Sequence, residues 1–279
     1  MPNPVLNEKT LRGAMDIDAR ESASGWAAPG AAWTAPGEVS RPPLHDGPIS
    51  PFRPDRLTVG GVARSGLILF GVLVVGAVFG WVSVKESSDG IVTFPAWVIL
   101  PALIAFGLAI FTHFKPKLAR FTGPVYALFE GLFLGAISHV YEAQWGGIVT
   151  QAVLGTAGVF VVMFVLYTAK IIKVTDRFRK MVFAATAGIA LIYLVGFVAR
   201  LFGGNLGFIN SPSITGIAFS VLVVGIAAFN LALDFDMIEQ LERSAAPRWM
   251  EWYAAFGLMV TVVWLYLEIL RLLSKLNRR

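Results

Sequence analysis

The chain has 279 residues, of which 56% are hydrophobic and 15% are charged, whereas a soluble domain is about half apolar and about a quarter charged, so we expect an integral membrane protein. Cysteine is absent, which excludes a disulfide framework, a thiolate metal site and a cysteine nucleophile. The net charge of +5 does not indicate nucleic-acid binding, because the Lys and Arg residues cluster at the ends of apolar runs, as membrane topology distributes them.

The first part of the chain, residues 1 to 60, differs in composition from the rest. It holds most of the prolines and many Ala, Gly and Ser residues, without a sustained apolar run. Such a segment buries too little surface to offset the entropy lost on ordering. We expect a disordered cytoplasmic tail over 1–60, without a signal peptide, and a membrane domain over 61–279. Within the tail, Trp26 to Trp33 is either linker or a short docking motif.

Seven later stretches are long and apolar enough to cross a bilayer, which takes about 20 residues each. The expected fold is therefore all-α, with seven transmembrane helices. Two glycine pairs, Gly76 with Gly80 and Gly131 with Gly135, have the spacing that lets helices approach closely. The expected spans are residues 66–84, 94–111, 121–141, 148–167, 181–202, 214–233 and 253–273.

The basic residues predict the orientation, because cytoplasmic loops carry an excess of Lys and Arg. They alternate along the chain in a way that puts the amino terminus inside. With seven crossings the carboxyl terminus then lies outside, although it is basic. Either the last span is re-entrant, or packing overrides the charge rule. The terminal cations in question are Arg271, Lys275, Arg278 and Arg279.

Two acids end the sixth apolar run. Asp234 and Asp236 are two residues apart, about 200° around a helix, so they face nearly opposite ways. Asp234 directly follows the apolar run and is the better candidate for a buried, functional acid. Asp236 reads as part of a solvated helix, in which Glu239 and Arg243 form an i,i+4 pair.

Glu268 lies within the last apolar run. Arg271, one turn further on, could neutralise it locally. Alternatively, Glu268 faces the bundle interior and meets Asp234. Two carboxylates in a site of low dielectric constant would share a proton, so such a pair could sense pH, holding a cation when charged and releasing it when protonated.

Glu130 is a lone acid in the third span, where a charge is costly. It lies either on a polar pathway or in a structural hydrogen bond to a neighbouring helix. His113, Lys115 and Lys117, at the end of the second span, are either partners for these acids or simple topology anchors. Asn230, one turn before Asp234, can line the same face.

At these residues the chain resembles the Bax inhibitor-1 (TMBIM) family, in its bacterial YccA-like branch. The likeness covers residues 60 to 275 and lies in the order of several segments. Besides the seven spans, these are the glycine-rich stretch of residues 129–138, Leu233-Asp-Phe-Asp236, and Leu265-Tyr-Leu-Glu268.

The resemblance implies six helices around a central last helix. It also implies that Asp234 and Glu268 form the pH sensor of a calcium leak and a weak calcium site. The family's basic partner of the first acid in the closed state would correspond to Lys115 or Lys117, with His113 and Arg271 as further candidates. The second acid is usually Asp in the family, and Glu268 is longer.

Three classes of function are weighed here, and a secondary transporter is a fourth, although the sequence shows no convincing internal repeat. A pH-sensitive cation leak, with calcium as the permeant ion and no tightly bound cofactor, is the first. The second is a regulator that restrains a membrane protease or a stress-response partner. An intramembrane enzyme is the third, and we do not expect it, because Ser138 and His139 are adjacent and lie about 100° apart on a helix. We expect a multi-pass protein of the plasma membrane; the sequence does not indicate its oligomeric state.

Overall fold

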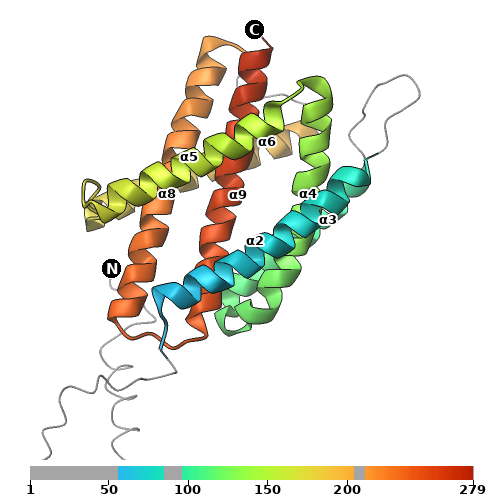
Figure 1. The fold of residues 1–279 in the computed structure, drawn as a ribbon. Coiled ribbons are helices and arrows are strands. Elements are labelled where there is room, and N and C mark those ends of the chain that lie inside the picture. The colour runs from blue at the N-terminus through green and yellow to red at the C-terminus, as the bar shows by residue number, and fades with distance from the viewer. Residues whose placement is uncertain (1–55, 85–95, 204–210, 279) are drawn as a thin grey trace, which may run out of the picture. The chain divides into compact units, whose positions relative to one another are not determined.

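The computed structural model describes residues 56–84, 96–203 and 211–278. Residues 1–55 of the predicted tail, including the stretch from Trp26 to Trp33, lie outside this part of the chain. Within the described residues the secondary structure is helical, apart from one isolated bridge between Arg56 and Pro247 (Figure 1).

Seven helices in the described ranges are long and apolar enough to cross a membrane, which confirms the predicted all-α, multi-pass membrane protein. A short 3-10 turn precedes α3 and another, η2 (Pro116–Leu118), precedes α4. The seven helices are α2 (Val59–Val82), α3 (Ile99–Phe114), α4 (Ala119–Gln144), α5 (Ile148–Thr168), α6 (Asp176–Leu201), α8 (Ile214–Arg243) and α9 (Met250–Asn277).

Most helices extend beyond the predicted apolar spans, because their ends are set by capping side chains and polar turns. The hydroxyl of Thr58 accepts a hydrogen bond from the Gly61 amide at 2.9 Å and begins α2. Ser213 begins α8 in the same way, accepting from the Gly216 amide at 3.2 Å. Such caps satisfy amides that lack a partner inside the helix.

The start of α2 is tied to the connection between α8 and α9. Leu57 is buried, and its amide donates to the carbonyl oxygen of Ala246 at 2.7 Å. The Glu251 carboxylate accepts from the Thr58 amide and hydroxyl at 3.1 and 3.2 Å. A Cβ atom on Gly61 would lie 2.0 Å from a Glu251 oxygen, so any larger residue there would displace the Glu251 carboxylate. Leu57 and Thr58 are therefore packed on the connection between α8 and α9.

Helices α2 and α4 approach closely at the predicted glycine pairs. A Cβ atom on Gly80 would lie 2.1 Å from the carbonyl oxygen of Leu132, and one on Gly135 would lie 1.9 Å from that of Ala77. Gly76 and Gly131 face the partner backbone at similarly short range. The interpretation of these pairs as helix-packing positions is confirmed.

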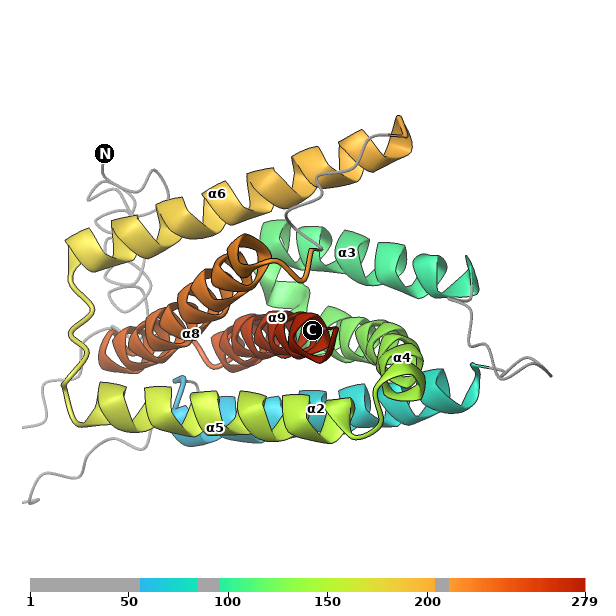
Figure 2. The same cartoon turned by 90° about the horizontal axis from the view of Figure 1, so that it is seen from above.

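The last helix, α9, is unbroken over its 28 residues. At 1.5 Å per residue it is about 42 Å long, enough to cross a bilayer, and it contains no break of the kind that a re-entrant segment would have. It contacts α2, α4, α5 and α8, whereas α3 packs on α4 and α6 packs on α8. In Figure 2, α9 is seen nearly end-on between α8 and α4.

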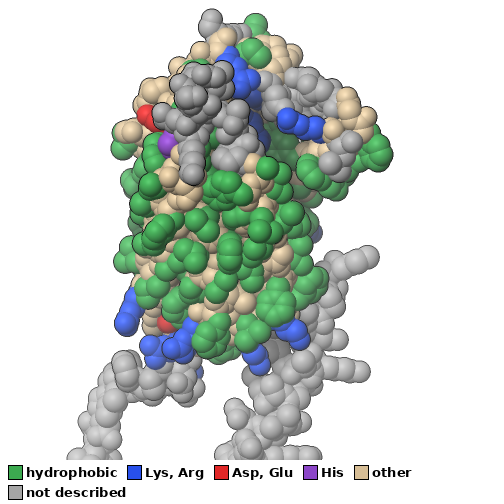
Figure 3. All heavy atoms as spheres, turned by 90° about the vertical axis from the view of Figure 1, so that its right-hand side faces the viewer, with side chains coloured by type: hydrophobic (Ala, Val, Ile, Leu, Met, Phe, Trp, Pro, Cys, Tyr) green, Lys and Arg blue, Asp and Glu red, His purple; other side chains and the backbone are tan. Residues whose placement is uncertain are grey.

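The surface has the banded distribution expected in a bilayer. Figure 3 shows hydrophobic side chains over the middle of one face, with Lys and Arg toward its two ends. We call the end where α2 and α9 begin the proximal end, and the end where α9 finishes the distal end. Large apolar side chains such as Leu67 and Phe183 are exposed, and in a bilayer lipid would cover them.

Candidate functional site

Asp234 lies on α8, where the helix passes α9. Its Oδ2 atom is buried and has no hydrogen-bond partner among the described residues. The hydroxyl of Thr261 on α9 lies beside the carboxylate. Nearly all buried polar atoms in proteins have a partner, so this unsatisfied carboxylate oxygen on a membrane-spanning helix makes Asp234 the main candidate for a functional acid.

Asn230 lies one turn from Asp234, on the side of α8 that meets α6. Its amide nitrogen donates to the Thr186 hydroxyl of α6 at 2.8 Å and to the carbonyl oxygen of Ile226 at 2.9 Å. Asn230 therefore lies near Asp234, as expected, but its amide nitrogen is already hydrogen-bonded to other residues. This contact fixes α6 against α8 one turn distal to the acid.

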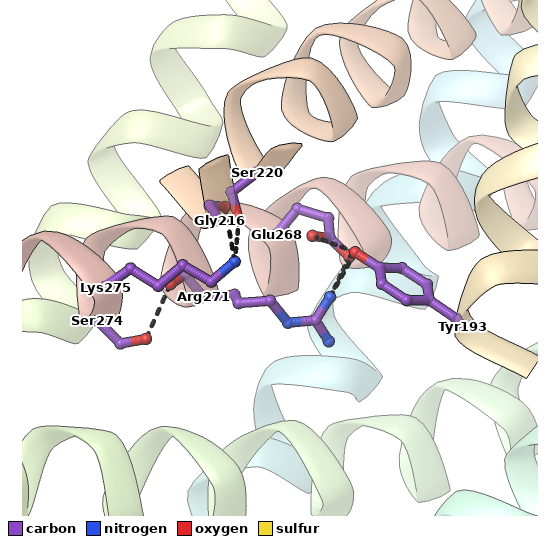
Figure 4. A network of polar contacts seen from close by, with 7 residues as sticks. All are labelled: Tyr193, Gly216, Ser220, Glu268, Arg271, Ser274 and Lys275. Carbon is purple, nitrogen blue, oxygen red and sulfur yellow. Dashed lines mark hydrogen bonds and ion pairs between the residues drawn. The ribbon is translucent and has the colours of Figure 1, made fainter. Parts of the chain in front are cut away.

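Glu268 lies in a separate cluster nearer the distal end, shown in Figure 4. Its side chain is 2% exposed. The Arg271 guanidinium donates to its Oε1 atom at 2.8 Å, and the Tyr193 hydroxyl of α6 lies 3.0 Å from both carboxylate oxygens. Arg271 also contacts the Tyr193 hydroxyl at 2.6 Å and stacks over its ring. The local neutralisation of Glu268 by Arg271 is the alternative that the structure forms.

The structure does not bring Asp234 and Glu268 together. No hydrogen bond or ion pair among the described residues joins them, and Thr261, which lies beside Asp234, is seven residues from Glu268 on α9. Seven residues correspond to about 10 Å along a helix. Because Arg271 and Tyr193 hold the Glu268 carboxylate toward α6, the expected carboxylate pair and its shared calcium site are absent from this arrangement.

Glu130 lies on α4 and is partly buried. It follows Tyr126 by one turn, and the Tyr126 ring packs edge-to-face on Phe256 of α9 with centroids 5.0 Å apart. Glu130 forms no hydrogen bond or ion pair with the residues that the structure describes. It therefore neither joins the Asp234 site nor makes the structural hydrogen bond that was the other expectation.

The candidate basic partners of Asp234 lie elsewhere. His113, Lys115 and Lys117 are exposed at the proximal end of α3 and in η2, where His113 meets the ring of Phe114. Arg271 is bound to Glu268. None of the four forms an ion pair with Asp234, so the resemblance-based assignment of a basic partner finds no counterpart in the described residues.

Comparison with known proteins places the chain in a family. A family model described as Bax inhibitor 1 like matches residues 3–278. The chain belongs to the Bax inhibitor 1 like family. The match is wider than the region that carries the resemblance and includes the amino-terminal segment. Comparisons with curated proteins and with solved structures found no match.

Three polar contacts of Asp236 and Glu239 in this Bax inhibitor 1 like protein were not expected. Asp236 is ion-paired with Arg179 of α6 at 2.6 Å and accepts from Gln240 at 2.6 Å. The expected pair of Glu239 with Arg243 is present, and Glu239 also accepts from the Tyr167 hydroxyl of α5. Arg179 and Tyr167 are far from these acids in sequence, so no local spacing could indicate them.

Lys275 differs most from its predicted position. Predicted to be a terminal topology charge, it is buried at 2% exposure and donates to the Gly216 carbonyl oxygen at 2.9 Å and the Ser220 hydroxyl at 2.7 Å, as Figure 4 shows. Its spacing of seven residues from Glu268 places both on one side of α9 and was the available signal.

Together these residues form a line where α6, α8 and α9 meet. On α8, Asp234 lies about four turns from Ser220 and one turn from Asn230, so the three share one side of the helix. On α9, Thr261, Glu268 and Lys275 are spaced seven residues apart and also share one side. We call this line the polar stripe: Ser220, Asn230, Asp234, Thr261, Glu268 and Lys275. Between its members lie three fully buried apolar residues, Val223, Ala227 and Leu265.

A second feature is an apolar groove of about 890 Å³. Side chains of α2 and α5 form its walls, and α4 and α9 contribute Leu134 and Val262 among others. Ser138 and Tyr266, which are hydrogen-bonded at 2.6 Å, are polar groups in this lining. His139 instead contacts the carbonyl oxygen of Trp81 at 2.9 Å, so Ser138 and His139 point to different helices.

Proposed function

We propose that this protein is a pH-sensitive cation leak, with calcium as the permeant ion and Asp234 as the group that binds a proton or the cation. The observation that carries the proposal is the buried, unpartnered oxygen of Asp234 on a membrane-spanning helix. Carboxylate oxygens suit calcium, and a weak site suits conduction. Family membership fits a membrane calcium-leak or regulatory role.

The pH response is assigned to Asp234 alone. A gate made of two carboxylates requires Glu268 to leave Arg271 and Tyr193, and three short contacts of 2.8 to 3.0 Å oppose this. Glu268 is then a fixed charge further along the polar stripe. Protonation of Asp234 removes its negative charge, which lowers the affinity of the stripe for a cation.

The polar stripe is closed in this arrangement. Val223 and Ala227 of α8 and Leu265 of α9 are each 0% exposed and separate the polar groups near Asp234 from those at the distal end. Water and ions do not cross a fully packed apolar layer. Opening therefore requires α8 and α9 to separate at these three residues.

The proposal includes the orientation of the protein and the membrane in which it lies. The proximal end carries most of the Lys and Arg residues, so we place it, with the amino terminus, in the cytoplasm of a plasma-membrane protein of the YccA-like branch. Arg271 and Lys275 are engaged inside the protein and do not act as free topology charges. We further propose that α9 is the central helix among six others. No tightly bound cofactor and no enzyme activity are assigned.

Calcium entry into proteoliposomes loaded with a calcium-sensitive dye tests the proposal. We expect entry by the wild type to vary with pH, and Asp234→Asn to lose that variation. Asp236→Asn is the matched control, since it lies two residues away on the same helix but is paired with Arg179. Equal pH dependence in the wild type and Asp234→Asn, with the proteins folded, contradicts the assignment.

A second function, regulation of a membrane protein such as a protease or stress-response partner, is favoured by the apolar groove. Its lateral walls on α2 and α5 offer a partner helix a surface within the bilayer. In that case Asp234→Asn leaves activity intact, whereas larger side chains at Val74 or Val153, both exposed in the groove, abolish binding. The two variants thus separate the functions.

A further inference from the structure

Lys275 is a buried cation in the last turn of a membrane-spanning helix. Its side chain is 2% exposed, although Lys is almost never fully buried without a specific reason. The ammonium group has three donors, and two of them reach oxygens at the start of α8. The distances are 2.9 Å to the Gly216 carbonyl oxygen and 2.7 Å to the Ser220 hydroxyl (Figure 4).

These two partners are neutral oxygens of the kinds that hold permeant cations. Backbone carbonyl oxygens replace the hydration shell of ions in selectivity filters, and hydroxyl oxygens can do the same. The ammonium of Lys is a compact point charge, comparable in this respect to a small monovalent ion. The Lys275 Nζ atom thus lies in a position that a free cation could occupy.

The place of this site in the fold gives it a role. Ser220 is on the same side of α8 as Asp234, and Lys275 is on the same side of α9 as Glu268, so the ammonium lies at the distal end of the polar stripe. The charged groups around it are Glu268, Arg271 and Arg278. Within the cluster, one acid, Glu268, faces two buried or half-buried cations, Arg271 and Lys275. A second cation entering there would meet repulsion.

We propose that the Lys275 ammonium is a tethered cation that occupies a monovalent-cation site, made by the Gly216 carbonyl and Ser220 hydroxyl oxygens, and holds the polar stripe closed at its distal end. This inference rests on the proposed leak. A structural tie between the ends of α8 and α9 would use the same contacts, but it would not respond to a free cation of the same shape.

The test compares two variants with a matched control. Lys275→Met keeps the length of the side chain without its charge, and Lys275→Ala also leaves space. Arg278→Met removes an exposed cation from the same end of α9, where Arg278 stacks over Trp145. We expect cation entry into proteoliposomes to rise about tenfold in both Lys275 variants, by loss of like-charge repulsion, and to stay unchanged in Arg278→Met.

Propylammonium chloride separates a tethered ion from a structural tie. In Lys275→Ala it should restore the low flux of the wild type and raise the melting temperature, because it binds the vacated site in the native state. Tetramethylammonium, which has no N–H donor, should do neither. The wild type should respond to neither compound.

The flux and the melting temperature together decide whether Lys275 occupies a cation site. Flux in both Lys275 variants equal to that of the wild type, in folded protein, overturns the inference, and so does an equal effect of propylammonium on all variants. If no protein conducts, the proposed leak fails by itself. The melting temperature then tests the cation site by itself. A propylammonium-dependent rise confined to Lys275→Ala supports the site, and the absence of any rise overturns it.

Discussion

Asp234 and Glu268 are both carboxylates on membrane-spanning helices, but their neighbours differ. Glu268 has an ion pair with Arg271 at 2.8 Å and a tyrosine hydroxyl close to both oxygens. Asp234 has the hydroxyl of Thr261 and one oxygen without a partner. A buried ion pair is a stable arrangement only while both members are present, whereas an unsatisfied carboxylate destabilises the protein as it stands.

The stability of Asp234→Asn follows from this difference. Replacing the carboxylate with a neutral amide removes an uncompensated buried charge, so we expect the free energy of unfolding in detergent to rise by about 1 kcal/mol. Asp236→Asn loses a half-exposed ion pair with Arg179, so we expect its free energy of unfolding to fall by about 0.5 kcal/mol. A marked loss of stability in Asp234→Asn would mean that its carboxylate has a partner after all.

Arg271→Gln should have the opposite effect, because it leaves the Glu268 carboxylate buried without its cation. We expect the free energy of unfolding to fall by about 3 kcal/mol, and most of the loss to be recovered in the double variant Arg271→Gln with Glu268→Gln. Thermal unfolding of the two single variants and the double variant measures the coupling. Additive losses would show that the two side chains do not act as a pair.

At the scale of elements, the contact between α2 and α4 depends on glycine. The atoms that a Cβ would meet at Gly135 are backbone atoms of Ala77, the nearest at 1.9 Å, and these cannot rotate away. The two helices must therefore separate to admit any side chain. This element pair forms one side of the bundle against which α9 packs.

Gly135→Ala tests this contact. We expect the free energy of unfolding to fall by about 2 kcal/mol, as for overpacked cores. Gly71→Ala on α2, where a Cβ would meet nothing within 4 Å, is the control and should gain about 0.5 kcal/mol from helix propensity. Similar stability in the two variants would contradict the close approach.

The presence of the helices could be predicted from the apolar runs, but the runs alone did not give the length of each helix. The apolar runs indicated all seven spans, because only helices satisfy their own backbone within a bilayer. They could not show that α8 continues from Leu233 to Arg243, since its last turns are held by contacts such as Asp236 with Arg179. Those contacts join residues that are distant in sequence.

At the scale of the whole molecule, the sequence predicted a pair of Asp234 with Glu268, whereas the structure pairs Glu268 with Arg271. An acid at the end of an apolar run, as Asp234 is, could be recognised from hydropathy alone. The pairing of Glu268 with Arg271 was one of two alternatives from the sequence. The sequence could not favour it over a pair with Asp234, because the contact also involves Tyr193 of α6, which is distant in sequence. Lys275 was counted as a free charge because burial at a chain end cannot be read from composition.

The same pairing explains the basic carboxyl terminus. Arg271 and Lys275 looked inconsistent with an outside location, yet both are bound to oxygens of the protein and contribute little to the charge exposed at the distal end. The proposed orientation, with the proximal end in the cytoplasm, agrees with the larger number of Lys and Arg residues at that end. An odd number of crossings needs no re-entrant segment.

The measurement that tests the central claim most directly is calcium entry into proteoliposomes at several pH values, for the wild type and Asp234→Asn side by side. If Asp234 is the titrating group, entry changes with pH in the wild type and is independent of pH in the variant. Identical pH dependence in the two proteins, or no entry by folded wild-type protein at any pH, would contradict it.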